Sequence, residues 1–358
     1  MNTVAIKAYL NSKKNPQLSY KTIHIGGSNG KGSTGYFLSQ MLVHLGFKVG
    51  YYYSPYTMER FDNIFIQNRS IQNILDKYLF YQSEMLGAGL TEFEQDTALA
   101  FLMFSEEKVD YAVIEVGLGG IHDATNVIHP EIGIITSTSL EHDEIIGPTI
   151  HDIATHQAGI IKKGMKVLLS PSIDKHIQSV FLNRIEEVTA TYIKHNSIRL
   201  KHTFPSYQTN NLTLAYRALN LIKDTPSFPI HLLKMMPFRF ERVRQNVIFD
   251  GAHNDEGIKA LINTLKAQQI KPIVYMSVLN TKKYERMIQR MIEYTGNVYV
   301  TSFDHQQSIQ MRDIANIKHA FWIEMREIID RIKTEKYDTI LITGSLYFLR
   351  TLKRLLEF

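Results

Sequence analysis

The sequence has 358 residues, of which 44% are hydrophobic and 21% are charged. This balance is ordinary for a soluble globular enzyme, and no apolar run approaches the ~20 residues of a membrane-spanning helix. The length leaves room for about two domains. Membrane association is therefore not expected.

The charge and the cysteine content narrow the class of protein further. A net charge of +5 favours anionic ligands in a general way. The basic residues form pairs such as Lys162-Lys163 rather than patches, and no motif that reads RNA or DNA occurs, so nucleic acid is not an expected partner. The absence of cysteine excludes disulfides and thiolate metal ligands and fits a reducing compartment. The first residues lack the features of a signal peptide, so we expect a cytoplasmic protein.

A glycine-rich loop dominates the N-terminal part of the chain. Residues 21–25 read as a buried strand, and apolar residues recur at helical spacing from Tyr36 to Leu45. Between them lies Gly26-Gly27-Ser28-Asn29-Gly30-Lys31-Gly32-Ser33-Thr34. Such a loop lets backbone N–H groups and a helix N-terminus face an anion, while a lysine supplies a positive charge. It therefore predicts a phosphate-binding loop.

The match to a strict phosphate-loop (Walker) pattern is incomplete. Ile25 stands where the first glycine of that pattern belongs, and Gly32 separates Lys31 from Ser33. The alternative is a glycine-rich turn with a solvated lysine.

Strands and helices alternate after the loop. Residues 47–53 read as a strand that ends at Ser54-Pro55, and the next fifteen residues read as irregular. Ser70 is expected to cap a helix that runs to about Leu86, and Thr91 with Glu94 has the spacing of a capping box. Further strands are expected at 110–115, 132–136 and 165–169, with a helix around 149–161. This alternation predicts βαβ units on a largely parallel sheet.

A proline-rich break separates this region from a second one. Residues 223–229 contain two prolines, and Pro237 follows closely. We place the boundary between about 224 and 238 and expect domains at 1–232 and 233–358. Beyond the break, strands are expected at the following residues: 246–249, 273–278, 297–302, 320–324 and 339–343. The second domain is therefore a smaller α/β unit.

Several polar residues follow predicted strands, where ligands of parallel sheets bind. Ser54, Glu115 and His142 suggest a metal site, because Mg²⁺ bound with nucleotide phosphates needs few protein oxygens. Each also has a structural explanation: Ser54 can end a strand, Glu115 can cap a turn, and a lone histidine is more often structural. Glu94 is equally well explained as part of the capping box.

Two further turns have the same ambiguity. Residues 117–120, Gly-Leu-Gly-Gly, and residues 123–126 resemble a second glycine-rich turn close to a ligand, which is a weak signal alone. In the second domain, Asp250 could hold a ribose hydroxyl and His253 could face a phosphate, unless residues 249–254 form only a polar turn.

Taken in order, these segments resemble the folylpolyglutamate synthase and dihydrofolate synthase family of the Mur ligase superfamily. The similarity covers about nine-tenths of the chain, and it is carried by the following stretches: 15–17, 28–33, 54–55, 60–61, 93–97, 115–120, 123–126, 158–160, Gln208 with Asn211, Arg239 with Glu241, 250–254 and 343–347. The Gly32 insertion after Lys31 is typical of this family. The resemblance implies an α/β fold with a P-loop ATPase domain of the Mur ligase central type and a smaller Rossmann-like C-terminal domain.

The resemblance also implies an activity, with ATP and Mg²⁺ as cofactors. In this family a substrate carboxylate attacks the γ-phosphate of ATP to give an acyl phosphate, and an amine, expected here to be glutamate, displaces phosphate. The implied nucleotide ligands are Gly27, Ser28, Asn29, Gly30, Lys31, Gly32, Ser33, Asn211 for the base, Asp250 for the ribose and Arg239 for the phosphates. The implied metal ligands are Ser54, Glu115 and His142, and the implied catalytic residues are Lys31, Glu115, His142, Arg239 and His253. Domain closure would assemble the site.

The chain departs from the family pattern at several positions. Gln157 stands where a carbamylated lysine usually serves a second metal, so that metal site is expected to be weaker, to use the Gln157 carbonyl oxygen or to be absent. Ile121 replaces a usual arginine, and Phe238 stands where glycine normally precedes the arginine. From the resemblance we also expect the N-terminal helix and loop that help to enclose the pteridine in relatives to be missing here.

These departures leave three hypotheses. The first is an ATP-dependent ligase that adds glutamate to folate or dihydropteroate. The second keeps the chemistry but uses a non-folate acid, and the third is a nucleotide-binding paralogue with weak or no ligase activity. We expect a monomer whose partners are small molecules.

Overall fold

A computed structural model describes residues 3–140, 143–196, 204–225, 227–336 and 338–356. Contacts divide the chain into two compact units. The first unit comprises Met1–Thr203 with Gln208–Lys234, and the second comprises Phe204–Tyr207 with Met235–Phe358. The expected boundary at 232/233 remains a prediction.

The first unit is built on an eight-stranded sheet with the order β4-β3-β2-β5-β1-β6-β7-β8. Its elements are α1 (Val4–Ser12), η1 (Pro16–Leu18), β1 (Lys21–Gly26), α2 (Lys31–His44), β2 (Val49–Tyr52), β3 (Ile64–Ile66), β4 (Arg69–Ser70), α3 (Ile74–Gly87), α4 (Glu92–Glu106), β5 (Tyr111–Glu115), η2 (Ala124–Val127), β6 (Ile132–Ile135), α5 (Asp143–Ile146), α6 (Ile150–Ala158), β7 (Lys166–Leu169), α7 (Lys175–Glu187), β8 (Thr191–Tyr192), α8 (Gln208–Ile222) and η3 (Ile230–Leu232). Six neighbouring strands, in the order β2-β5-β1-β6-β7-β8, pair in parallel. β3 and β4 extend the sheet beyond β2 as antiparallel strands. The predicted α/β class is confirmed.

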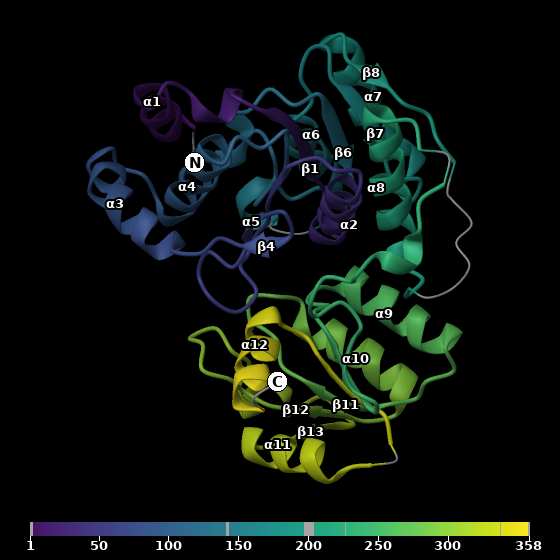
Figure 1. Ribbon diagram of the computed structural model, residues 1–358. Coiled ribbons are helices and arrows are strands. Elements are labelled where there is room, and N and C mark those ends of the chain that lie inside the picture. Colours follow the sequence, from purple (N-terminus) through teal and green to yellow (C-terminus); the bar gives the residue numbers. More distant parts are fainter. Residues whose placement is uncertain (1–2, 141–142, 197–203, 226, 337, 357–358) are drawn as a thin grey trace. The chain divides into compact units, whose positions relative to one another are not determined.

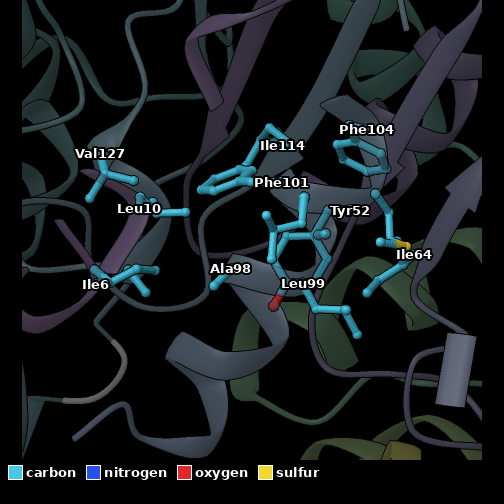
Figure 2. Packing of buried hydrophobic residues seen from close by; sticks show 14 of the residues in the cluster. Ile6, Leu10, Tyr52, Ile64, Ala98, Leu99, Phe101, Phe104, Ile114 and Val127 are labelled. Carbon is cyan, nitrogen blue, oxygen red and sulfur yellow. The ribbon is translucent and has the colours of Figure 1, made fainter. Parts of the chain in front are cut away.

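Helices cover both faces of this sheet because successive side chains of a strand point to opposite sides. Tyr52 of β2 packs with α4, and Figure 2 shows it beside Leu99 in a cluster that also contains Phe101 and Ile114. Its neighbour Tyr51 faces α2, where a Cβ added to Gly35 would lie 2.6 Å from the Tyr51 ring. On that side α2 runs beside α8 (Figure 1).

The helix α4 has the start that its sequence predicts. The Thr91 side chain accepts from the Glu94 N–H, and a Glu94 carboxylate oxygen accepts from the Thr91 N–H at 2.9 Å. The capping box is therefore confirmed, and it accounts for Glu94 as a structural residue.

The region before α3 differs from the prediction. Ser70 lies in β4 and does not cap a helix, and Asn73 precedes the first residue of α3. The expected irregular stretch also contains β3. These strands are short and lie at the edge of the sheet, so they carry little of the alternation by which a strand is recognised in a sequence.

The second unit has a six-stranded sheet with the order β13-β12-β11-β14-β10-β9. Its elements are β9 (Glu241–Arg244), β10 (Val247–Asp250), α9 (Asp255–Ala267), β11 (Ile273–Met276), α10 (Tyr284–Thr295), β12 (Val298–Val300), η4 (Met311–Ile314), β13 (Ala320–Trp322), α11 (Met325–Thr334), β14 (Ile340–Thr343) and α12 (Leu346–Leu355). The five predicted strands are present and parallel, and β9 is an additional antiparallel edge strand. Asp250 lies at the carboxyl end of β10, opposite Thr343 of β14.

No helix in the described ranges is both long enough and apolar enough to cross a membrane.

Candidate functional site

The glycine-rich loop joins β1 to α2, as predicted. β1 pairs with β5 on one side and β6 on the other, so the loop leaves the sheet where the chain's connections diverge, the usual position of a ligand site. Gly27 and Gly30 have φ values of +133° and +91°. A Cβ at Gly30 would lie 2.3 Å from Asn211 Oδ1, so both backbone angle and space require glycine there.

A hydroxyl-rich segment after β6, residues 136–139, forms hydrogen bonds to the backbone of this loop. The Ser28 N–H donates to the Ser137 carbonyl at 2.9 Å, and the Asn29 N–H donates to Ser137 Oγ at 2.8 Å. Thr136 Oγ1 in turn donates to the Asn29 carbonyl at 2.7 Å. The N–H groups of Ser28 and Asn29 are therefore engaged within the protein rather than directed at an anion.

The charged end of the loop is at the start of α2. Lys31 Nζ donates to the Gly27 carbonyl at 2.8 Å and to the Ser28 carbonyl at 3.2 Å, which places the ammonium over the loop. Gly30 precedes α2, and no side chain caps this described helix terminus. Lys31 and the N-terminus of α2 therefore provide the positive potential that a phosphate needs.

Helix α8 contacts both the loop and the start of α2. Gln208 Nε2 donates to Ser33 Oγ at 3.1 Å, and Asn211 Nδ2 donates to Gln208 Oε1 at 2.8 Å. Both amides are buried. Asn211, predicted to contact a base, lies against Gly30.

The predicted metal ligands that the structure describes lie at the same edge of the first sheet. Glu115 is the last residue of β5 and is paired in register with Ile25 of β1, and Ser54 follows β2. The Glu115 residue is 5% exposed. A hydroxyl and a carboxylate suit Mg²⁺, which keeps several waters and needs one or two protein oxygens. His142 lies outside the described residues, and no cluster of three metal-ligating side chains occurs in the ranges that the structure describes.

Gln157 is part of the loop's support rather than a solvent-exposed remnant. Its Nε2 donates to Ser28 Oγ at 3.2 Å, and its Oε1 accepts from Thr138 Oγ1 at 2.8 Å. The residue is 3% exposed. The carbonyl oxygen considered above as a metal ligand therefore already accepts a hydrogen bond from a loop hydroxyl.

The Gly-Leu-Gly-Gly turn, residues 117–120, is organised by Asp123. A carboxylate oxygen of Asp123 accepts from the Leu118 N–H at 2.8 Å, and burial raises the pKa of this carboxyl. A Cβ at Gly120 would lie 2.5 Å from the His156 carbonyl of α6. Close packing against α6 therefore explains Gly120 without a ligand.

In the second unit, the predicted residues gather at the end of β10. Asp250 Oδ2 accepts from the Phe240 N–H at 2.9 Å, and Oδ1 accepts from the Ala252 N–H at 3.0 Å. Arg239 Nη1 donates to the Gly251 carbonyl at 3.3 Å, and His253 Nδ1 lies 2.8 Å from the same oxygen. Arg239, Asp250 and His253 are thus brought together.

Burial raises the pKa of Asp250, while the Tyr207 hydroxyl and the Arg239 charge oppose that rise. The sequence interpretation missed Tyr207, whose hydroxyl donates to Asp250 Oδ2 at 2.7 Å. It also missed residues 136–139, although a run of hydroxyl side chains directly after a strand was a usable signal.

The chain is similar to known proteins in sequence and in fold. The Mur ligase middle domain matches residues 25–254, and the Mur ligase glutamate ligase domain matches residues 238–346. The dihydrofolate synthase/folylpolyglutamate synthase of Bacillus subtilis (strain 168) is 30% identical, across 96% of this chain and 92% of its own length. The folylpolyglutamate synthase of Lacticaseibacillus casei is also 30% identical, across 82% of this chain and 79% of its own.

Solved structures give the same result. The apo form of L. casei folylpolyglutamate synthase has a TM-score of 0.84 at 26% identity and covers 100% of this chain and 95% of its own. Folylpolyglutamate synthase of Mycobacterium tuberculosis, complexed with ADP and AMPPCP, has a TM-score of 0.87 at 23% identity, with coverages of 99% and 95%. The latter likeness shows the fold.

Proposed function

Because the chain belongs to the Mur ligase family, in its dihydrofolate synthase/folylpolyglutamate synthase branch, and is an ATP-dependent ligase, we propose that it joins glutamate to a folate or dihydropteroate carboxylate. The observation that carries this proposal is the loop between β1 and α2, where Lys31 donates to the Gly27 carbonyl and Ser33 accepts from Gln208. The glutamate ligase domain that matches the second unit supports glutamate as the amine.

The proposed chemistry begins with an electrostatic problem, because an anionic carboxylate must approach the γ-phosphate of ATP. We assign to Lys31 and the α2 N-terminus the neutralisation of the transferring phosphoryl group. Attack of the carboxylate oxygen breaks the bond between the γ-phosphorus and its bridging oxygen, giving ADP and an acyl phosphate. The neutral amine of glutamate then attacks the acyl carbon, phosphate leaves, and the amine proton passes to solvent.

The other assignments follow the same proposal. Ser54 and Glu115 would hold Mg²⁺, which when bound supplies charge neutralisation for the phosphates. His142 is assigned to a second Mg²⁺. Arg239 and His253 are assigned to the phosphates, Asp250 to the ribose and Asn211 to the base. Gly27, Ser28, Asn29, Gly30, Gly32 and Ser33 are assigned to the loop that surrounds the phosphates.

A ligase assay tests the function. Purified protein with Mg-ATP and glutamate should release ADP only when an acid acceptor is added, and dihydropteroate or a reduced folate should serve. Activity only with other acids would favour the non-folate ligase, and ATP binding without turnover on any acid would favour the inactive paralogue.

Two lysine variants control the assay. Lys31→Ala should lower turnover by at least about a hundredfold, the usual cost of losing one stabilising group at a transferring phosphoryl. Lys163→Ala removes an exposed lysine away from the loop and should leave turnover unchanged. Equal turnover in the two variants would refute the site assignment.

We further propose that the enzyme is a cytoplasmic monomer. The absence of cysteine from the sequence supports a reducing compartment. Sedimentation analysis of the purified chain and fractionation of cells test these two points.

A further inference from the structure

The segment that connects the two units carries an unusual pair of neighbours. Residues Phe204–Tyr207 belong by their contacts to the second unit, and Gln208, the next residue, begins α8 of the first unit. The side chains of Tyr207 and Gln208 each form a hydrogen bond to a proposed nucleotide-binding residue of their own unit. Tyr207 is bonded to Asp250, and Gln208 is bonded to Ser33.

Two side chains fix this segment within the second unit. The Tyr207 hydroxyl donates to Asp250 Oδ2 at 2.7 Å, a length typical of a hydroxyl bonded to a carboxylate. Ser206 Oγ lies 3.0 Å from Thr264 Oγ1 of α9. Tyr207 therefore donates to Asp250 from a segment that is itself held in the second unit by a second hydrogen bond.

The Tyr207 donor favours the ionised form of Asp250. The residue is 3% exposed, and burial raises its pKa. The Tyr207 hydroxyl lowers this pKa again, as do Arg239 and the N–H groups of Ala252 and Phe240. Since an ionised carboxylate is an acceptor at both oxygens and carries no donor, the Tyr207 donor favours the form that accepts from a ribose hydroxyl.

We propose that Tyr207 is a positioning residue for the nucleotide: its hydroxyl orients the Asp250 carboxylate toward the ribose. This inference rests on the proposed function, because it takes Asp250 as the ribose ligand. Tyr207 acts through Asp250 and does not need to touch the reacting atoms.

The test compares ATP with 2′-deoxy-ATP and 3′-deoxy-ATP as ligase substrates of the full chain. Tyr207→Phe removes only the hydroxyl, and it should raise the KM for ATP about tenfold without changing kcat, the cost of about one charge-assisted hydrogen bond. The KM for the deoxynucleotide that lacks the recognised hydroxyl should stay the same, so discrimination between the nucleotides should shrink.

A matched control is available on α8 itself. The Tyr216 hydroxyl donates to the Thr225 carbonyl at 2.6 Å and is not bonded to Asp250. Tyr216→Phe should leave the KM for all three nucleotides unchanged. An equal rise in KM for both tyrosine variants would mean that the hydroxyl acts on stability alone and would overturn the inference.

Two further variants, Asp250→Asn and the double variant Asp250→Asn with Tyr207→Phe, distinguish a failure of this inference from a failure of the proposed function. In the Asp250→Asn background, adding Tyr207→Phe should cause no further loss of ATP affinity, since the hydroxyl acts through the carboxylate. Additive losses would overturn the inference while leaving the ligase assignment intact. If Asp250→Asn itself keeps the wild-type KM and discrimination, the ribose assignment of the proposed function fails, and the inference fails with it.

The pH profile gives a readout that a purely structural role would not change. Loss of the Tyr207 donor raises the pKa of Asp250, so Asp250 takes up its proton at a higher pH. The KM for ATP should therefore begin to rise at a higher pH in Tyr207→Phe than in the wild type as the solution is acidified. Superimposable profiles of KM against pH would contradict the proposed role.

Discussion

An ion pair between Arg60 and Asp96 secures the segment that follows Ser54, and it makes a sharp prediction. Arg60 Nη2 lies 2.7 Å and Arg60 Nε lies 3.1 Å from the same carboxylate oxygen of Asp96. The Asp96 side chain is 9% exposed and the Arg60 side chain is 31% exposed. The guanidinium also lies 4.8 Å from the Phe61 ring centre and 4.5 Å from that of Tyr78. Arg60→Ala leaves the Asp96 carboxylate buried without this partner.

The expected loss follows from the burial of the pair. Removing one partner of a fully buried ion pair costs about 3–5 kcal/mol. Because Arg60 is 31% exposed, water can reach the Asp96 carboxylate in the variant, and we expect about 2–3 kcal/mol at about pH 7.5. For a unit of this size that loss lowers the melting temperature by about 5–10 °C.

The loss should depend on pH in a direction that the burial of Asp96 determines. Burial already raises the pKa of Asp96, and Arg60 opposes the rise, so Arg60→Ala raises this pKa further. Between the unfolded value of about 4 and the raised folded value, the folded state binds more protons, and the stability of the variant falls as the pH rises. The loss should therefore be smaller at about pH 5 than at about pH 7.5.

Thermal unfolding followed by far-ultraviolet circular dichroism at the two pH values measures this difference. A double variant, Arg60→Ala with Asp96→Leu, is the control, because it removes the uncompensated carboxylate and should recover part of the loss at the higher pH. Equal losses at the two pH values, with no recovery in the double variant, would refute the reasoning.

Three further predictions test other features. Gly30→Ala should cost more than about 1 kcal/mol and weaken ADP binding in calorimetry, because φ is +91° and the new Cβ would meet Asn211. Phe238 has φ of +59° and is fully buried, so Phe238→Gly should unfold at a higher temperature than Phe238→Ala by the equivalent of about 1 kcal/mol; the fluorescence of Trp322, in the same unit, reports the transition. Burial lowers the pKa of Lys162 to about 8. Between this value and the unfolded pKa of about 10.4, the unfolded state binds more protons than the folded state, so the free energy of unfolding rises with pH. In urea titrations the wild type should therefore gain stability relative to Lys162→Met as the pH increases from about 8 to about 10.

The strand pattern and the loop were predictable because each is a local property of the sequence. Ile23 and Ile25 alternate with polar residues directly before a glycine-rich turn, and this local pattern identifies β1 and its loop without reference to the rest of the chain. The capping box at Thr91 and Glu94 is local in the same way. The short edge strands β3, β4 and β9 were missed because pairing with a neighbouring strand, and not their own pattern, defines them.

The supports of the site were not predictable for a related reason. Ser137 holds Asn29 across a separation of 108 residues, and Tyr207 holds Asp250 across 43. Neither contact leaves a mark in the spacing of the sequence, since the fold alone brings the partners together. Motif-based interpretation finds residues that would face a ligand and overlooks those that stand behind them.

The three departures from the family pattern are integrated into the fold. Gln157 uses both ends of its amide, on Ser28 and on Thr138. Ile121 fills the space beside Gly159, where an added Cβ would lie 2.2 Å from its Cγ1.

Phe238, the third departure, stacks on Phe249 at 6.2 Å in spite of its left-handed backbone. A glycine would adopt that backbone more easily, but it would give up a buried aromatic side chain worth about 3 kcal/mol or more. Within the described residues Gln157 completes hydrogen bonds and Phe238 completes aromatic packing, whereas Ile121 is 37% exposed, so the fold accommodates all three substitutions.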